Sequence, residues 1–568
     1  LLLVLSACSL PKAGRLQWED AAGEQARLFG DAPVEMHLRF DMQEVEKTLK
    51  VREFVPGELR YNGLVWKNIG IRYRGGVFSK GRPKRAFKLK FNTAPGRRFY
   101  GLERLNLNME RNDPTFVREK IACELLRGLG VPAPRIGYVR LYVNGVYRGL
   151  YLNMEQIDAR FVKTHLGLSG GILYKAGWPA CLRVNPQSGQ PETEYFPVKE
   201  LPRNLKRERK RLVAAQEAVA AAKKRGDAAA MARLSPEVVR LRRSFLEAQA
   251  APLARLIRLL HDSTPGRLAA ELPPRFAVEG FLKVLAVHTL IAAWDNYHMT
   301  PGNFYLYWDP AGDRIHWIAY DYDNSFGVDF WGIDWQNAPL LDFTPRTNGS
   351  EDRPLIDKVL AVPAWRTQLL RRIRGLLDGP FREEALMARA RRLQALIAPA
   401  VREEMESRRN YSKEPGGYRL FADNLEKTAG TGNRFFQGFL PHVRGRITAA
   451  QAQLPALEAG RGPARLYNNG RRQEALAVAP LARDRLLPGT EHWFGIAPVA
   501  GMTNALLVKS LSAQVRAALV APDGRQRELV LKPGLQLFHL EPGDPFRMLR
   551  LQATGAFSVL VELVCLSV

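Results

Sequence analysis

The amino-acid sequence predicts an α+β protein in which two β-rich regions flank a mostly helical one. In residues 34–158, apolar residues alternate with polar residues, which is typical of strands with one buried face. Most of the elements predicted in residues 159–459 are helices. Residues 464–568 contain short apolar runs separated by turn sequences, which predict a small β-sandwich domain. A chain of 568 residues is long enough for three or four domains.

The composition favours an anionic partner. Lys and Arg number 84 against 57 Asp and Glu, a net charge of +27. Such an excess attracts nucleotides, acidic proteins or anionic lipids, although biased coding would produce the same composition. No RNP, zinc-finger or basic-zipper pattern accompanies the charge, so specific nucleic-acid binding is not expected.

The N-terminal residues predict attachment to a bacterial envelope. An apolar run at residues 1–5 is followed by Ser6-Ala7-Cys8, which resembles the lipoprotein box at the end of a signal peptide. We therefore expect a truncated lipoprotein signal peptide over residues 1–8 and a lipid on Cys8, with Ser9 favouring the outer membrane. Residues 9–33 are predicted to be a linker. No run reaches transmembrane length.

The first β-rich region contains a glycine turn between two predicted strands. The strands cover Leu64–Arg74 and Ala86–Phe91, and Arg74 leads into Gly75 and Gly76. Backbone N–H groups in such a turn approach a phosphate closely, and neighbouring cations add charge. A plain hairpin is the alternative interpretation.

A helix and a second hairpin follow. Asp113-Pro114 predicts a helix start, with Asp113 as the cap and the helix running to about Leu126. This helix carries Glu119 and Glu124 as candidate partners for a lysine on a strand. Strands at 138–143 and 147–154 are joined at Asn144-Gly145, a strong hairpin sequence.

Residues at about 202–261 are rich in Lys, Arg, Ala and Leu. They predict two helices in an antiparallel hairpin, inserted into the helical region. The insert is either a basic arm for an acidic substrate or membrane surface, or a solvated helical pair without a partner.

The residues that carry the chemistry surround a hairpin. Strands at 304–308 and 315–320 are separated by a turn centred near Gly312. This centring predicts that Asn303 and Asp321 lie side by side. Asp295 precedes the first strand and Asp323 follows the second. The sequence therefore predicts that these oxygen-bearing side chains converge at one end of the hairpin.

Such a group of side chains suits magnesium-dependent phosphoryl transfer. Mg²⁺ prefers oxygen ligands and is often held by one or two carboxylates together with substrate phosphates. Asn303 and either Asp321 or Asp323 are the predicted metal ligands, and the choice between the two aspartates stays open. Asp295 is the predicted base, which accepts the proton of the attacking hydroxyl. The alternative is a polar hairpin whose acids cap loops and pair with arginines.

Residues 294–327 resemble the corresponding block of the spore-coat protein H (CotH) kinase family, atypical protein-kinase-like enzymes. Arg74-Gly75-Gly76 and residues 83–91 are similar to the family's arginine–glycine turn and lysine-bearing strand, so the likeness covers roughly residues 34–445. It implies a two-lobed protein-kinase-like core, with a small lobe at 34–158 and a large lobe at 159–459. It also implies ATP and Mg²⁺ as cofactors.

The resemblance also assigns roles to individual residues. Lys84 best matches the lysine that contacts phosphate, with Lys88 in reserve. Glu119 matches the acid that holds this lysine. The residues Arg74, Gly75 and Gly76 match the phosphate-binding turn. Glu155 is expected either to contact adenine or ribose, or to have a structural role such as pairing with Arg160.

The predicted function is transfer of the γ-phosphoryl group of ATP to a hydroxyl of a protein or other acceptor. The predicted location is the bacterial cell envelope, lipid-anchored to the outer membrane or secreted, where ATP is scarce. The alternative is therefore an envelope-anchored binding or adhesion protein, or a pseudokinase without phosphotransfer.

Overall fold

The computed structural model describes residues 21–48, 53–75, 84–330, 335–341, 353–407, 417–431 and 434–459, and the strands of the C-terminal part. Residues 1–8, with the predicted lipid-bearing Cys8, lie outside the described residues, as does Gly76. Within the described ranges, no helix combines the length and the apolar character needed to cross a membrane.

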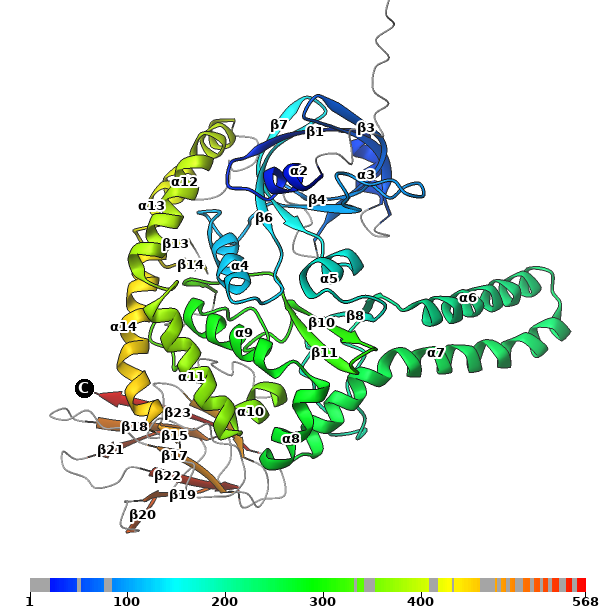
Figure 1. The fold of residues 1–568 in the computed structure, drawn as a ribbon. Helices are drawn as coiled ribbons and strands as arrows, with labels where there is room; N and C mark the ends of the chain where they lie inside the picture. Colours follow the sequence, from blue (N-terminus) through cyan, green and yellow to red (C-terminus); the bar gives the residue numbers. More distant parts are fainter. Residues whose placement is uncertain are drawn as a thin grey trace, which may run out of the picture.

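The N-terminal region is a closed barrel of seven strands (Figure 1). In order around the barrel, the strands are β1 (Val34–Phe40), β2 (Val55–Tyr61), β3 (Leu64–Arg74), β4 (Ala86–Lys90), β5 (Arg104–Asn108), β7 (Val146–Glu155) and β6 (Ile136–Val143). The barrel closes because β1 pairs antiparallel with β2 on one edge and parallel with β6 on the other. Phe87, Leu89 and Phe91 are buried, as their alternation predicts.

The predicted two-lobed, protein-kinase-like core is wrong, whereas the α+β class is confirmed. The strands assigned to a small lobe close on themselves instead of forming an open sheet. Closure depends on the parallel pairing of Val34 with Val139, residues about a hundred positions apart. Alternating apolar residues show which face of a strand is buried, but they contain no information about such a distant partner.

Residues 21–28, predicted as part of a linker, form helix α2 (Ala21–Leu28) against the barrel (Figure 1). Leu28 and Phe29 belong to the barrel core, and Asn153 donates a hydrogen bond to the Leu28 carbonyl at 2.9 Å. Gly137 lies so close that an added Cβ would meet this carbonyl oxygen at 2.1 Å. The linker prediction is therefore corrected for α2. The short helix α3 (Met42–Lys47) follows β1.

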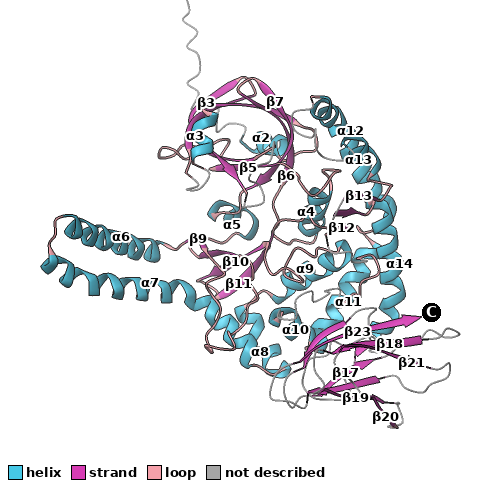
Figure 2. Ribbon diagram, turned by 180° about the vertical axis from the view of Figure 1, so that it is seen from behind, coloured by secondary structure: helices cyan, strands magenta, loops and turns pink. Residues whose placement is uncertain are grey.

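The central region is a helical body that also contains two small sheets (Figure 2). Its helices outside the insert are α4 (Arg118–Gly128), α5 (Ala159–Leu166), α8 (Pro265–Arg275), α9 (Val278–Ile291), α10 (Pro354–Leu360), α11 (Pro363–Asp378), α12 (Glu383–Glu406), α13 (Gly417–Asp423) and α14 (Phe439–Glu458). One sheet has the order β11 (Arg314–Ala319), β10 (Phe304–Asp309), β8 (Ile172–Lys175), β9 (Val198–Glu200). The other has the order β12 (Val328–Asp329), β14 (Arg434–Phe436), β13 (Ala429–Thr431). Helix α9 is almost wholly buried, so it anchors the loop that begins at Ala292.

The segment predicted as a helical insert folds as α6 (Arg203–Lys224) and α7 (Ala228–Asp262). The two helices run antiparallel and project away from the rest of the molecule (Figures 1 and 2). The turn between them contains Gly226, and Pro236 lies within α7 without ending it.

The C-terminal part contains two mostly antiparallel sheets. One has the order β15 (Leu476–Ala477), β17 (Glu491–Gly495), β22 (Met548–Ala553), β19 (Val515–Val520), β20 (Gln526–Leu529). The other has the order β16 (Ala482–Leu486), β23 (Val559–Ser567), β18 (Asn504–Ser510), β21 (Gly534–Leu540). Neither sheet includes a residue of the candidate site.

Candidate functional site

Several of the predicted site residues lie where the barrel meets the hairpin of β10 and β11. Arg74 ends β3 and donates a hydrogen bond to the Tyr320 hydroxyl, at the end of the hairpin. Lys175 ends β8, pairs with Tyr305 of β10, and lies 5.0 Å from the centre of the Tyr320 ring. Segments far apart in the sequence are therefore joined here by direct contacts.

Five cations form what we call the basic cluster: Arg72, Arg74, Lys88, Arg104 and Lys175. Burial, together with the positive charges of the other four, lowers the pKa of Lys88 to about 7. Lys88 Nζ donates to the amide oxygen of Gln156 at 2.5 Å, and it forms no ion pair with any described residue. The Gln156 amide carries no charge, so it does not offset the repulsion that Lys88 experiences from the other cations. An anion at this position would remove that repulsion.

Five carboxylates form what we call the acidic cluster: Glu110, Glu119, Asp295, Asp321 and Asp323. Burial, together with the charge of Asp321, raises the pKa of Glu119 to about 8. The pKa values of Glu110 and Asp323 lie well above their usual range, because burial and the neighbouring carboxylates both oppose ionisation. Oε2 of Glu119 is buried without a hydrogen-bond partner. This half of the site would be stabilised by a cation.

Asp295 lies in the loop that follows α9. One carboxylate oxygen accepts a hydrogen bond from the Thr300 hydroxyl, and the other accepts one from Asn324 Nδ2 at 2.7 Å. Burial raises the pKa of Asp295 to about 6. Because both oxygens are oriented and the pKa lies close to neutral, this carboxylate is suited to accepting a proton.

The hairpin register differs by one residue from the predicted register. Phe304 pairs with Ala319 and Asp309 with Arg314, so Asn303 is level with Tyr320 and not with Asp321. Asn303 instead donates to the backbone carbonyl of Asp295 at 2.8 Å. The prediction centred the turn on Gly312, whereas the paired positions centre it between Ala311 and Gly312.

The structure does not bring Lys84 and Glu119 together. Lys84 is buried and pairs with Glu404 of α12 at 2.7 Å, and it also donates to the Leu150 carbonyl at 2.6 Å. Gly149 has φ 105° and lies so close to Glu404 that an added Cβ would meet its carboxyl carbon at 2.0 Å. Lys84 therefore joins the barrel to the helical body, and Lys88 is the lysine that lies in the basic cluster.

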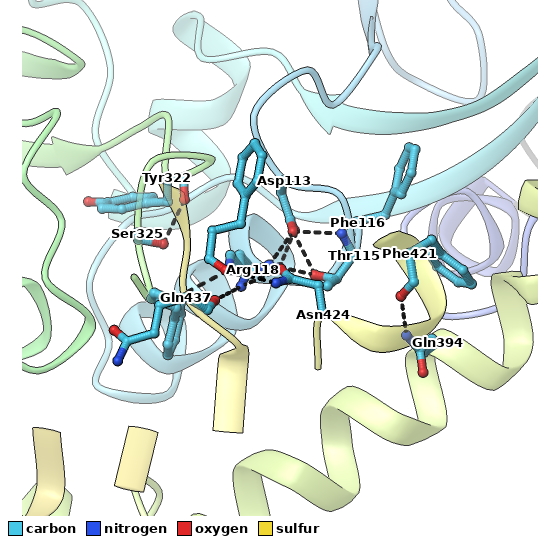
Figure 3. A network of polar contacts seen from close by, with 12 residues as sticks. Asp113, Thr115, Phe116, Arg118, Tyr322, Ser325, Gln394, Phe421, Asn424 and Gln437 are labelled. Carbon is cyan, nitrogen blue, oxygen red and sulfur yellow. Dashed lines mark hydrogen bonds and ion pairs between the residues drawn. The ribbon is translucent and has the colours of Figure 1, made fainter. Parts of the chain in front are cut away.

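Glu119 is positioned by its neighbour Arg118, which is completely buried (Figure 3). The Arg118 guanidinium donates to Asp113 Oδ1 at 2.7 Å, to Asn424 Oδ1 at 3.0 Å and to the Gln437 carbonyl at 2.8 Å. Glu119 Oε1 accepts a hydrogen bond from the Tyr322 backbone N–H at 3.3 Å. The start of α4 is thus fixed against the segment that carries Asp321 and Asp323.

Two other predictions differ from the structure in this region. The helix begins at Arg118 and not at Pro114, because Asp113 accepts hydrogen bonds from the backbone N–H groups of Thr115 and Arg118 and forms a turn. Glu124 pairs with Arg389 of α12 at 2.6 Å and does not reach a strand lysine.

Glu155 has a structural role in this structure. It pairs with Arg135 at 2.6 Å and with His165 at 3.0 Å, and these partners outweigh burial and lower its pKa to about 2. Arg160, the partner predicted as an alternative, instead packs against Gly101. A Cβ added at Gly101 would lie 2.8 Å from Arg160 Nη2. A nucleotide contact by Glu155 stays a prediction.

The acidic cluster suits a cation that is shared with a substrate. Among the described residues, no three His, Cys, Asp or Glu side chains converge closely enough to bind a metal ion by themselves. Mg²⁺ does not require such a set, since one or two carboxylates and phosphate oxygens commonly suffice. The raised pKa values and the unpartnered oxygen of Glu119 fit this kind of site.

We expect Mg²⁺ to stabilise the ligand-free protein at pH 8 more than at pH 5. Glu119 has a raised pKa in the fold, so the folded state binds more protons than the unfolded state between about pH 4.5 and 8. The free energy of unfolding therefore falls as pH rises through this window. At free Mg²⁺ about tenfold above its Kd, binding adds about 1.4 kcal/mol. Thermal unfolding with and without Mg²⁺, at pH 5 and at pH 8, measures the stabilisation by Mg²⁺ at each pH.

The matched variants separate this cation site from a general salt effect. Asp321→Asn removes a member of the acidic cluster and is expected to abolish the increase. Asp313→Asn, at the exposed turn of the same hairpin, is expected to retain it. An equal increase in both variants would contradict a cation site in the acidic cluster.

Sequence reasoning missed several residues that complete the site. Asn112 donates to Asp323 Oδ2 at 2.9 Å, Asn324 holds Asp295, and Tyr320 accepts from Arg74. Glu110 also joins the acidic cluster, with φ 46°. Left-handed backbone is uncommon for such residues and often occurs at functional sites. The only sequence indication was the adjacency of Asn324 to Asp321-Tyr322-Asp323.

The fold and the site define an α+β protein in which a β-barrel and a helical body share a half-buried site with adjoining basic and acidic halves. The family model described as "CotH kinase protein" matches residues 71–429, which is more than half of the chain. The chain therefore belongs to the CotH kinase protein family.

Two curated proteins of Bacillus subtilis (strain 168) are similar over shorter segments. "Inner spore coat protein H" is 26% identical over 134 residues, which cover 24% of this chain and 36% of that protein. "Inner spore coat protein H-like protein" is 35% identical over 71 residues, 12% of this chain and 23% of that protein. The matched segments thus span about a third or less of these relatives.

Solved structures are similar only locally. A de novo designed double-stranded β-helix matches 16% of this chain and all of its own, with 15% identity and a TM-score of 0.12. The cupin domain of Drosophila melanogaster CENP-C matches 21% of this chain and 97% of its own, with 14% identity and a TM-score of 0.12. Scores this low carry no argument about the fold or the function.

Proposed function

We propose that this protein is a magnesium-dependent phosphotransferase that moves the γ-phosphoryl group of ATP to a hydroxyl of a protein acceptor. The observation that carries the proposal is that a basic and an acidic cluster adjoin in one half-buried site. A polyphosphate with its cation requires positive side chains for the phosphates and oxygen ligands for the metal, and the basic and acidic clusters offer both. The family's description as a kinase protein supports this assignment.

The residues divide into three roles in this proposal. Lys88 and Arg74 bind the phosphates, with Lys175 as a further cation beside them. Asp321, Asp323 and Asn303 hold Mg²⁺, which neutralises charge on the phosphates when it is bound. Glu119 supports the acidic cluster through Tyr322 and does not pair with a lysine.

Asp295 accepts the proton of the acceptor hydroxyl. The hydroxyl oxygen forms a bond to the γ-phosphorus, the bond from that phosphorus to the bridging oxygen breaks, and ADP leaves. Thr300 and Asn324 hold the Asp295 carboxylate during this step. Because the pKa of Asp295 lies at about 6, the carboxylate is largely ionised at pH 7 and above.

The proposal is tested by incubating the purified full chain with γ-labelled ATP and Mg²⁺, together with casein-like acceptors and the chain itself as an acceptor. We expect label on protein that requires Mg²⁺ and is lost in Asp321→Ala. Magnesium-dependent binding of ATP without any transfer would contradict the phosphotransferase and leave a nucleotide-binding protein. Absence of both would contradict the whole assignment.

We expect Lys88→Met to weaken binding of the Mg²⁺–ATP complex by about tenfold to a hundredfold, because it removes a cation that contacts phosphate at close range. The matched control is Lys90→Met, which removes the same charge two residues along β4. Isothermal titration measures both affinities. Equal losses in the two variants would show that only net charge matters, which would contradict a specific phosphate contact by Lys88.

We also propose that the protein acts at a cell surface. Both named relatives are spore-coat proteins by description. Attachment through a lipid on Cys8 stays a prediction from the sequence. Mass spectrometry of the mature protein from its native host, with and without Cys8→Ala, would detect the lipid.

A further inference from the structure

The helical hairpin of α6 and α7 has no role in the proposed chemistry, yet its surface is unusual. Residues 203–262 contain 15 Lys and Arg against 6 Asp and Glu, a net charge of +9 without histidine. The hairpin also exposes Val213 at 42%, Val239 at 67% and Leu246 at 45%, three of the six large hydrophobic residues exposed among the described ones. Exposing apolar side chains to water is unfavourable, so a group of them on one surface often marks a binding site.

These three apolar side chains lie on one face of the hairpin. Leu212 of α6 and Phe245 of α7 are buried between the helices and mark the packed side of each. At about 100° per residue, Val213 lies about 100° round from Leu212. Round α7, in the same rotational sense, Leu246 lies about 100° from Phe245 and Val239 lies about 120° from it. In two antiparallel helices packed side by side, the same sense leads to the same face.

Two arginines lie on this face beside the apolar residues. Arg209 is about 60° round from Leu212, and Arg242 is about 60° round from Phe245, again in the same sense. Both are exposed, and neither forms an ion pair with a described residue. Because the turn between the two antiparallel helices is centred near Gly226, Arg209 lies near the level of Arg242, and Val213 near the level of Val239.

Most carboxylates of the hairpin are directed elsewhere. Glu237 and Glu247 lie round α7 in the opposite sense, and Glu208 lies near the packed side of α6. Glu217 lies about 140° round from Leu212 in the same sense as Val213, one turn further along α6, so it borders this face. The face with Val213, Arg209, Val239, Arg242 and Leu246, which we call the docking face, thus contains two cations and three apolar groups, with one acid at its edge.

We propose that the docking face binds the surface of an anionic lipid bilayer. Basic side chains beside apolar ones fit this partner, because the cations attract lipid headgroups while the apolar groups enter the boundary with the acyl chains. A soluble polyanion such as nucleic acid would use the cations but offers no apolar layer to Val239 and Leu246. The inference is independent of the proposed phosphotransfer.

The test is sedimentation of the full chain with vesicles of phosphatidylglycerol and phosphatidylcholine, compared with vesicles of phosphatidylcholine alone. We expect binding only to the anionic vesicles. Arg209→Gln with Arg242→Gln is expected to weaken it about 25-fold, since each basic residue near an anionic surface contributes about fivefold. Val239→Ser with Leu246→Ser is expected to weaken it at least about tenfold.

The matched control is Arg207→Gln with Arg240→Gln, which removes the same charge from the opposite face, about 140° round each helix in the other sense. We expect it to retain most of the binding. Equal losses in the two arginine pairs, or no loss in the serine variant, would overturn the docking face and indicate nonspecific polyanion binding. Binding of ATP by each variant, measured in parallel, keeps this outcome separate from the fate of the proposed function.

Discussion

Asp295→Asn is expected to lower kcat for phosphoryl transfer by about 10²–10⁴, the range that general-base catalysis contributes. The amide retains the size of the carboxylate but cannot accept a proton. Thr300 still finds an oxygen to which it can donate, whereas Asn324 must turn its own amide oxygen toward the new NH2 group. Steady-state kinetics with labelled ATP measures the loss, and binding of ATP is expected to be nearly unchanged.

The pH dependence distinguishes a base from a residue that only supports the loop. In the wild-type protein, kcat is expected to rise with pH through about 6, because the Asp295 carboxylate must be ionised to accept a proton. Asp295→Asn should lose this rise. Asp313→Asn, at the far end of the same hairpin, should retain both the rate and the rise. A wild-type rise that persists in Asp295→Asn would contradict the assignment of the base.

Lys84→Met is expected to destabilise the protein by about 3–5 kcal/mol, the usual cost of removing one partner of a buried ion pair. Without Lys84, the buried Glu404 carboxylate loses its cation beside the barrel wall. Glu404→Gln should have a similar effect. Urea denaturation followed by circular dichroism measures the free energy of unfolding for each variant.

The double variant and a surface pair serve as controls. Lys84→Met with Glu404→Gln should cost less than the sum of the single changes, because no charge is left unpaired. Arg391, which is also on α12, forms an exposed ion pair with Glu426. Arg391→Met removes this pair and should cost less than about 1 kcal/mol. If Lys84→Met kept its stability but lost ATP binding, Lys84 would have the phosphate-contacting role that the family resemblance implies.

The sequence was informative where a local pattern determines the structure. The hairpin of β10 and β11, the helical insert and the burial of Phe87 and Leu89 follow from alternation, turn residues and helical periodicity. The one-residue error in the register at Asn303 arose because several turn lengths fit the same loop sequence, and the side chains alone do not choose between them.

The closed barrel and the partner of Lys84 could not be predicted in this way. Both depend on contacts between distant segments: Val34 with Val139 in the barrel, and Lys84 with Glu404, which is 320 positions further along the chain. A family resemblance identified the segments that meet, but only coordinates show that Lys88, and not Lys84, lies among the other cations.

The central claim is that one half-buried site holds the phosphates on its basic cluster and the cation on its acidic cluster. A crystal structure of the full chain with Mg²⁺ and a non-hydrolysable ATP analogue tests it most directly. The account predicts phosphate oxygens within hydrogen-bonding distance of Lys88 and Arg74, and Mg²⁺ bound by Asp321 or Asp323. A nucleotide bound elsewhere, or phosphates bound to Lys84 with the acidic cluster empty, would contradict it.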